Sequence, residues 1–457
     1  MPKPSDEPFE ILPEKIRQNF SYTLHFDWVL YPFDIQTRKA YTKMLKKVVM
    51  ISDEESEIIN NGLDKISEDI QNGDYQFKAN QPDIHTAIEQ ALRDEIGDLA
   101  SKINIGISKL DLISTDLRLW TKNEIDILQQ LIKKFQKTIL RHAKEHIKTY
   151  MPAYTDLQPT QTITVAHQLL AYMEMFQRDF DRLSALLNQL NVMPLGSSYG
   201  AGTTIPIDRI FLANSLGFSK ISNNSIDAIS DRDFLIEYLF CLSMIGQHMS
   251  RICADVILWT SEGFQFITLP EEFTEETLRT SKLRRSIVPE LIRGKTSKLF
   301  SSLHTALVAV KGIPTHYTRD CQEDKEAAFE ASDITQTSIE VLSRLFSTCT
   351  FNVEKINKAV HEHHWETLVL VEYLIKNDIP PDEAIKIIRT TLDYALDNNK
   401  KIEDLSLQEF QDIHKGFGQE VMLLLTPKGT IQSYACIGSS NPDRIQHEIE
   451  EWDSILG

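Results

Sequence analysis

The 457-residue sequence predicts an all-α protein with very long central helices. Residues 315–379 contain neither Gly nor Pro, and residues 207–269 contain no Pro and only three Gly. Such long stretches without helix breakers suit helices, whereas a many-stranded sheet needs frequent turns. Apolar residues also recur at helical spacing in one segment, at Leu128, Leu131, Ile132, Phe135, Ile139 and Ala143.

In chain order, one long helix is predicted to begin near Thr121. Thr121 and Glu124 have the spacing of a capping box, in which the two side chains satisfy free backbone N–H groups. Breaker-rich segments then interrupt the helical pattern, and a turn lies near the start of a C-terminal helical unit. Because loops on a rigid scaffold often carry function, the interruptions are candidate sites. The interruptions are residues 151–156, 194–206 and 260–289, and the turn is residues 377–381.

The segment 233–259 is predicted to form a helix of a different kind, because it is apolar nearly all round. A helix without a solvated face is buried, either inside a large bundle or against other subunits. This segment therefore indicates burial in a bundle or in a subunit interface.

Charge and composition exclude several classes of protein. The chain has 48 Lys and Arg against 66 Asp and Glu, a formal charge of −18, whereas nucleic-acid and anionic-membrane binding need a positive face. No run of about 18 apolar residues predicts a membrane helix, and the start of the chain lacks the apolar core of a signal peptide. The five cysteines form no CxxC pair, which suits free thiols in a reducing cytoplasm. We expect a soluble, cytoplasmic protein without nucleic-acid or membrane partners.

Five segments carry a family pattern: QPDIHTAIEQALRDEIG (residues 81–97), STDLRLW (114–120), GAGTTIPIDR (200–209), NSIDAISDRDF (224–234) and YTRDCQEDKEAAFEASD (317–333). In this order along the chain, they closely resemble the argininosuccinate lyase family, which includes the delta-crystallins and belongs to the fumarase/aspartase superfamily. The resemblance implies a subunit of three α-helical domains, at residues 1–105, 106–355 and 356–457. It also implies that the central domain joins three others in the twenty-helix core of a homotetramer. No cofactor is implied.

The family reaction splits argininosuccinate into arginine and fumarate by β-elimination, and its active sites lie where three subunits meet. The resemblance places Asp156 where the family has a functional histidine, and Glu290 where it has the partner glutamate of that histidine. Two carboxylates that face one another across subunits need a proton or a cation between them. The alternative is that Asp156 only caps a helix or is hydrated.

The family's mobile loop and its carboxylate-binding segment also differ here. Thr277 falls on the position of the family's catalytic serine, and the family motif around it is absent. Ile107, Lys109 and Leu110 replace two arginines and an asparagine that grip carboxylates in the family. The loop instead carries four cations, Arg279, Lys282, Arg284 and Arg285.

These four cations allow two interpretations. They form either a solvated basic segment or an anion site for an acidic ligand, a partner or the Asp156–Glu290 pair of a neighbouring subunit. Glu275 and Glu276 could instead neutralise the run locally.

Other positions match family residues that contact the arginine-bearing half of the substrate. They either support the scaffold alone or line a remaining pocket for an amino-acid-like ligand. They are Asp83, His85, Thr155, Gln158, Tyr317, Gln322 and Lys325.

No metal site is predicted. His361 and His364 would share a helix face, but the spacing is not that of a zinc motif and no third ligand can be named.

Two functions remain. The first is a pseudoenzyme or scaffold that binds an amino-acid-like ligand and cleaves argininosuccinate poorly. The second is a repurposed enzyme acting on an amino acid or an aspartate-derived conjugate.

Overall fold

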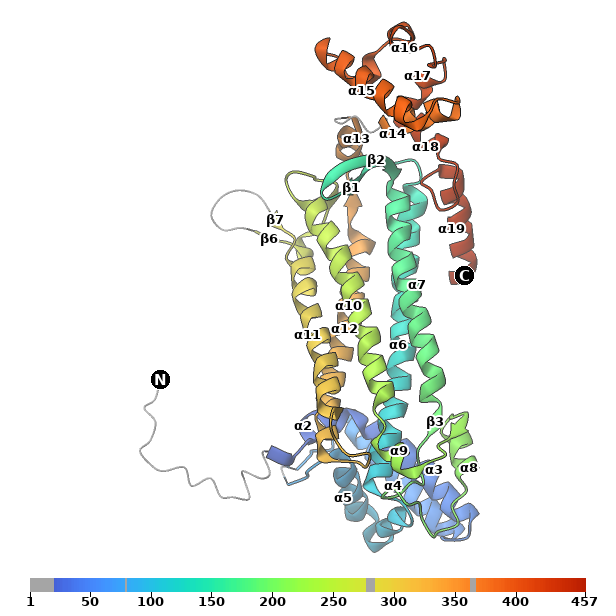
Figure 1. Ribbon diagram of the computed structural model, residues 1–457. Coiled ribbons are helices and arrows are strands. Elements are labelled where there is room, and N and C mark those ends of the chain that lie inside the picture. The colour runs from blue at the N-terminus through green and yellow to red at the C-terminus, as the bar shows by residue number, and fades with distance from the viewer. Residues whose placement is uncertain (1–19, 79, 277–283, 362–366) are drawn as a thin grey trace. The chain divides into compact units, whose positions relative to one another are not determined.

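The computed structural model describes residues 20–78, 80–276, 284–361 and 367–457, and it confirms the helical fold class (Figure 1). The described residues form two compact units. Unit 1 comprises residues up to 129, 180–246 and 296–336, and unit 2 comprises residues 130–179, 247–295 and 337–457. The division into three domains, at residues 1–105, 106–355 and 356–457, remains a prediction. Among the described helices, none is long and apolar enough to cross a membrane.

Five long helices each contribute one part to each unit. Aromatic contacts hold their segments together within a unit. In unit 1, Trp120 packs edge-on against Tyr238 and Phe329, with ring centroids 5.8 and 4.7 Å away. In unit 2, Phe135 packs against Phe176 at 4.6 Å. The helices are α6 (Lys109–Glu145), α7 (Val165–Leu190), α10 (Asp233–Thr260), α11 (Ile287–Val310) and α12 (Asp324–Thr348).

The apolar pattern of α6 is confirmed, but its predicted start is wrong. Five of the six periodic residues are fully buried, all except Leu131. The helix begins at Lys109, and the Thr121 hydroxyl donates to the carbonyl of Leu117, one turn earlier within the same helix. The capping-box pattern is local, whereas buried Leu112 and Leu117 extend the apolar face upstream, so burial decides where the helix starts.

The shorter helices of unit 1 have clear end signals. In α4, the Ser52 hydroxyl accepts from the N–H of Glu55, whose carboxylate accepts from the N–H of Ser52. Gly73 ends α4 with a positive φ of 79°. The helices are α2 (Leu24–Asp27), α3 (Tyr31–Lys47), α4 (Asp53–Asn72), α5 (Ile84–Ile96), α8 (Arg209–Ser215) and α9 (Ser225–Ser230), with 3-10 helices at Trp28–Leu30, Gly97–Asn104 and Arg319–Gln322.

The breaker-rich segment 151–156 forms most of the first strand of a hairpin and its turn, and not a plain loop. Strand β1 (Tyr150–Thr155) pairs antiparallel with β2 (Gln158–Thr164). Asp156 and Leu157 form the two-residue turn with φ of 53° and 59°. The other strands have two residues each. Strand β3 (Val192–Met193) pairs with β4 (Lys220–Ile221), β5 (Ile267–Thr268) with β8 (Thr350–Phe351), and β6 (Glu275–Glu276) with β7 (Arg284–Arg285).

The C-terminal helices surround a core of their own in unit 2. Leu370, Leu374, Phe410 and Phe417 are among its buried residues. The predicted turn at residues 377–381 is confirmed, because Asp378 has a φ of 62° and Pro381 is the first residue of α15. The helices are α13 (Val353–His361), α14 (Thr367–Lys376), α15 (Pro381–Asp397), α16 (Leu407–Ile413), α17 (Val421–Leu424), α18 (Pro427–Ser433) and α19 (Pro442–Leu456), and 3-10 helices lie at Glu271–Phe273 and Ile402–Asp404.

The cysteines allow a first test of the fold. Four of the five are buried, and burial raises the pKa of both Cys253 and Cys349 to about 12. Because the thiolate is the reactive form, we expect DTNB at pH 8 to modify one thiol per native chain, the exposed Cys436. Five should react in denaturant, and Cys436→Ser should lose the native signal. Rapid reaction of several thiols in the native protein would contradict this packing.

Candidate active site

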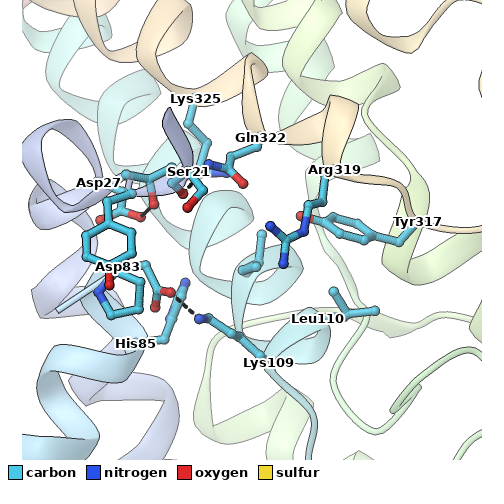
Figure 2. Close-up of a pocket in the computed structure, with 14 residues that line it drawn as sticks. Ser21, Asp27, Asp83, His85, Lys109, Leu110, Tyr317, Arg319, Gln322 and Lys325 are labelled. Atoms are coloured by element: carbon cyan, nitrogen blue, oxygen red, sulfur yellow. Dashed lines mark hydrogen bonds and ion pairs between the residues drawn. The ribbon is translucent and has the colours of Figure 1, made fainter. Parts of the chain in front are cut away.

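A cavity of about 490 Å³ lies in unit 1 (Figure 2). Four segments line it: the chain before and within α2, the start of α5, the start of α6, and residues 317–325. Figure 2 shows Lys325 and Gln322 on one side and His85 with Lys109 on the opposite side. The cavity thus combines carboxylates, an imidazole and cations with a small apolar wall of Leu110 and Ile113.

Lys109, which replaces a family arginine, is already engaged. Its ammonium pairs with the carboxylate of Asp83 and donates to the hydroxyl of Thr86, 3.1 Å away. Asp83 is the N-cap of α5, and its other oxygen accepts from the N–H of Thr86 at 2.9 Å. Burial acts to raise the pKa of Asp83, but the charges of His85 and Lys109 lower it overall. Lys109 is therefore a poor candidate to hold a second carboxylate from a ligand.

His85 rests on a buried charge network below the cavity wall. The side chain is 3% exposed, and its Nδ1 lies 2.6 Å from Asp34 and 3.5 Å from Asp116. Burial acts to lower the pKa of His85, but the hydrogen bond and charge of Asp34 raise it overall. Burial and the charge of Asp34 raise the pKa of Asp116 well above its ordinary value, which favours a proton on Asp116. The network fixes the His85 ring and favours its protonated form.

The side chains of Asp34, His85 and Asp116 are also close enough together to hold a metal ion. Arg38, however, places its Nε 2.5 Å from the carboxylate of Asp34 and donates to the carbonyl of His85. Because Arg38 already supplies a positive charge beside Asp34, the buried cluster needs no metal ion for charge balance.

A second buried ion pair supports the opposite side of the cavity. The Nε of Arg232 lies 2.5 Å from the carboxylate of Asp324, and the two side chains are 2% and 1% exposed. The Arg232 guanidinium also lies over the ring of Tyr317, 5.9 Å from its centroid. Gln322 donates to the backbone carbonyl of Ser21 at 3.1 Å. These contacts hold residues 317–325 in place along the wall.

Lys325 is the buried cation of this wall. Its side chain is 4% exposed, and its Nζ lies 3.7 Å from the Asp324 carboxylate, which Arg232 already neutralises. Among the described residues, its ammonium has no hydrogen-bond partner within 3.5 Å. Because Lys325 shares the Asp324 carboxylate with Arg232, two buried cations face one buried carboxylate here, and this favours an anionic group in the cavity.

Five of the seven predicted ligand residues line this cavity: Asp83, His85, Tyr317, Gln322 and Lys325. Sequence reasoning missed Asp27 and Arg319, which also line it. Arg319 lies two residues after Tyr317 in a segment that the resemblance had identified, and this could have pointed to it. Asp27 had no such signal. Its carboxylate accepts from the Thr23 hydroxyl at 2.5 Å and from the N–H of Ile84 at 3.1 Å.

The other predicted residues belong to unit 2 and do not line this cavity. Thr155, Asp156 and Gln158 are exposed in the β1–β2 hairpin, and Glu290 is exposed in the first turn of α11. The carboxylates of Asp156 and Glu290 have no side-chain hydrogen bond or ion pair with any residue that the structure describes. Asp156 caps no helix. It occupies a hairpin turn position with positive φ, which Asp tolerates better than most residues.

The basic loop is described only in part, because Thr277, Arg279 and Lys282 lie outside the described residues. Arg284 is neutralised locally. Its Nε donates to the Thr274 hydroxyl at 2.7 Å, and its Nη1 lies 3.3 Å from Glu271 and 3.8 Å from Glu276. Arg285 lies opposite Glu275 in the backbone register of the β6–β7 ladder. The contacts of Arg284 favour the local-neutralisation interpretation for that residue.

Known proteins that resemble this chain include several lyases. A family model described as "Lyase" matches residues 7–276. Argininosuccinate lyase from Prochlorococcus marinus is 36% identical over 440 residues, 96% of each chain. Argininosuccinate lyase from Acetivibrio thermocellus is 37% identical over 413 residues, 90% of each chain.

Solved structures agree on the fold. An EDDS lyase variant with bound fumarate has a TM-score of 0.83 at 22% identity, and the match covers 96% of this chain and 88% of that one. A class II fumarase from Schistosoma mansoni has a TM-score of 0.74 at 14% identity, covering 90% and 93%. At these identities the likeness extends to the fold alone.

Proposed function

The chain belongs to the argininosuccinate lyase family, and we propose that it binds an amino-acid-like ligand without cleaving argininosuccinate at an ordinary rate. The observation that carries this proposal is which side chains the start of α6 presents to the cavity. Lys109 is held by Asp83 and Thr86, and Leu110 presents an apolar side chain to the cavity. Neither side chain can offer the planar, two-pronged grip on a carboxylate that arginine provides. The elimination therefore lacks a group that its transition state needs.

The rest of the cavity supports ligand binding. Lys325 and Arg319 are cationic, while Asp27 and Asp83 are acidic, so the wall carries charges of both signs. A zwitterionic amino acid has an ammonium and a carboxylate that complement such a wall. The raised pKa of His85 favours the positively charged form of its ring.

The proposal is tested by thermal shift with amino acids, dicarboxylates and their conjugates. We expect an amino acid or a conjugate to raise the melting temperature, and Lys325→Met to weaken its binding roughly 10- to 100-fold, since a charged hydrogen bond contributes about 1.5–3 kcal/mol. Lys311→Met, at an exposed lysine of the same unit, is the matched control and should bind normally. Absence of any shift across the panel would argue for a scaffold without a ligand.

We further propose a homotetramer. In unit 1, Phe240 on α10 and Phe300, Leu307 and Val308 on α11 expose large apolar side chains, which suit a subunit interface. Light scattering should give about 210 kDa, four times the 52.4 kDa of one chain. A mass near 52 kDa at micromolar concentration would refute this proposal.

The tetramer would also explain the residues that lie outside the cavity. In the proposed assembly, other subunits bring the β1–β2 hairpin and Glu290 to the cavity of unit 1, with Asp156 in the place of the family histidine. Cytoplasmic location belongs to the same proposal, and four buried free thiols support it.

A second candidate is a repurposed enzyme acting on an amino acid or an aspartate-derived conjugate. Arg319 favours it, because this exposed cation extends into the cavity (Figure 2). Mass spectrometry of such compounds after incubation with the protein would separate the two candidates, since only an enzyme changes them.

A further inference from the structure

A second group of potential ligand side chains lies in unit 2, at the C-terminal end of α6. His142, Glu145 and His146 each offer one ligand atom, and these atoms lie within 4.8 Å of one another. His142 and Glu145 lie in the last turn of α6, and His146 is the residue that directly follows the helix. This group is distinct from the histidine run at residues 361–364 of the sequence.

His142 is held in the tautomer that a metal ligand requires. Its Nε2 lies 2.5 Å from the backbone carbonyl of Phe346. A carbonyl only accepts hydrogen bonds, so Nε2 carries the proton and Nδ1 of the neutral ring keeps its lone pair. Nδ1 lies 3.8 Å from the carboxylate of Glu145. Metal-bound histidines commonly donate their other N–H to a backbone carbonyl in this way.

His146 is also held in place by neighbouring groups. Its Nδ1 lies 3.0 Å from the Thr149 hydroxyl. The ring of Phe351 packs against both imidazoles, with centroids 5.7 and 4.8 Å away. The two rings are therefore positioned by contacts outside the group itself.

Glu145 supplies a negative charge for the ion, and its exposure to solvent leaves the group accessible. Its side chain is 58% exposed, so an ion can reach the group from solvent. The C-terminal end of a helix carries a partial negative charge, which favours a cation there. Two imidazoles and one carboxylate are a ligand set that zinc accepts, with a remaining position open to water.

We propose that His142 Nδ1, the Glu145 carboxylate and His146 bind one divalent transition-metal ion, with Zn²⁺ as the best match. The ion would stabilise the last turn of α6 at the point where Phe346 and Phe351 contact it. This site is separate from the cavity of unit 1, and it does not depend on the proposed function.

Isothermal titration of the full-length, metal-stripped protein with ZnCl₂ tests the site. We expect one zinc ion per chain and a higher melting temperature with zinc than with EDTA. Glu145→Gln and His146→Gln should each weaken binding about tenfold or more. Melting of both variants in EDTA should match the unsubstituted protein, which shows that they fold.

Two controls make the result decisive. His447→Gln removes an exposed histidine of α19 that pairs with Glu451 in a helical arrangement similar to that of the His142–Glu145 pair. His364→Ala removes a histidine of the alternative run. Both should bind zinc like the unsubstituted protein. Absence of saturable binding at micromolar zinc, or binding lost in His364→Ala and kept in His146→Gln, would overturn the proposal.

Discussion

Purified protein is expected to release no fumarate from argininosuccinate above background. The start of α6 offers Leu110 and an already paired Lys109 where the family resemblance implies carboxylate-binding arginine and asparagine. Loss of a single donor that stabilises developing negative charge costs about 3–4 kcal/mol, or a factor of roughly 10²–10³ in rate. Asp156, in place of the family histidine, adds a further loss. The combined effect should place turnover far below a typical value of about 10 per second.

The measurement is a continuous assay of fumarate absorbance. Argininosuccinate lyase from Prochlorococcus marinus, a 36% identical relative, serves as the positive control under the same conditions. Turnover within about tenfold of 10 per second would contradict the prediction and the pseudoenzyme proposal together. Ligand binding at Lys325 would still stand in that case, because binding and cleavage are measured separately.

Arg232→Leu is expected to destabilise the protein by about 3–5 kcal/mol, which is the usual cost of leaving one member of a buried ion pair without its partner. The Arg232–Asp324 pair is almost completely buried, and Asp324 would keep an uncompensated carboxylate. Burial acts to lower the pKa of Arg232, but Asp324 raises it overall, which agrees with a pair that stays charged. Urea denaturation at one fixed protein concentration measures the change in unfolding free energy.

Two further variants show whether the pair itself is responsible. Arg232→Leu combined with Asp324→Leu should cost clearly less than the sum of the two single changes, because the double variant leaves no unpaired charge. Arg319→Leu is the matched control, since this arginine belongs to the same cavity but is exposed, and it should change stability by no more than about 0.5 kcal/mol. An Arg232→Leu change below about 1 kcal/mol would show that the pair contributes little.

Local patterns explain which elements could be predicted. The helix from Asp233 to Thr260 and the turn before Pro381 depend on residues that are neighbours in the chain, so periodicity and breakers were sufficient. The start of α6 was missed because a local capping signal competed with apolar burial upstream, and burial prevailed. The hairpin at Asp156 was missed because a short strand pair leaves little periodic signal.

The residues of the cavity also divide into features that could be predicted and features that could not. The resemblance identified Asp83, His85, Tyr317, Gln322 and Lys325 as candidates, and the structure brings all five to one cavity. Their electrostatic states were not readable from the chain. His85 depends on Asp34, which lies 51 residues away, and the Arg232–Asp324 pair joins residues 92 positions apart.

The helical fold class, the long apolar helix of residues 233–259, the family and the residue types available to the site could all be predicted from the sequence. Tertiary structure alone decided that Lys109 is neutralised by Asp83, that Lys325 faces a cavity as a buried cation, and that Asp156 occupies an exposed turn. The difference arises from how far apart along the chain the interacting residues lie. Helix formation and motif spacing depend on residues within a few positions, whereas burial and charge compensation depend on groups that only folding brings within a few ångströms.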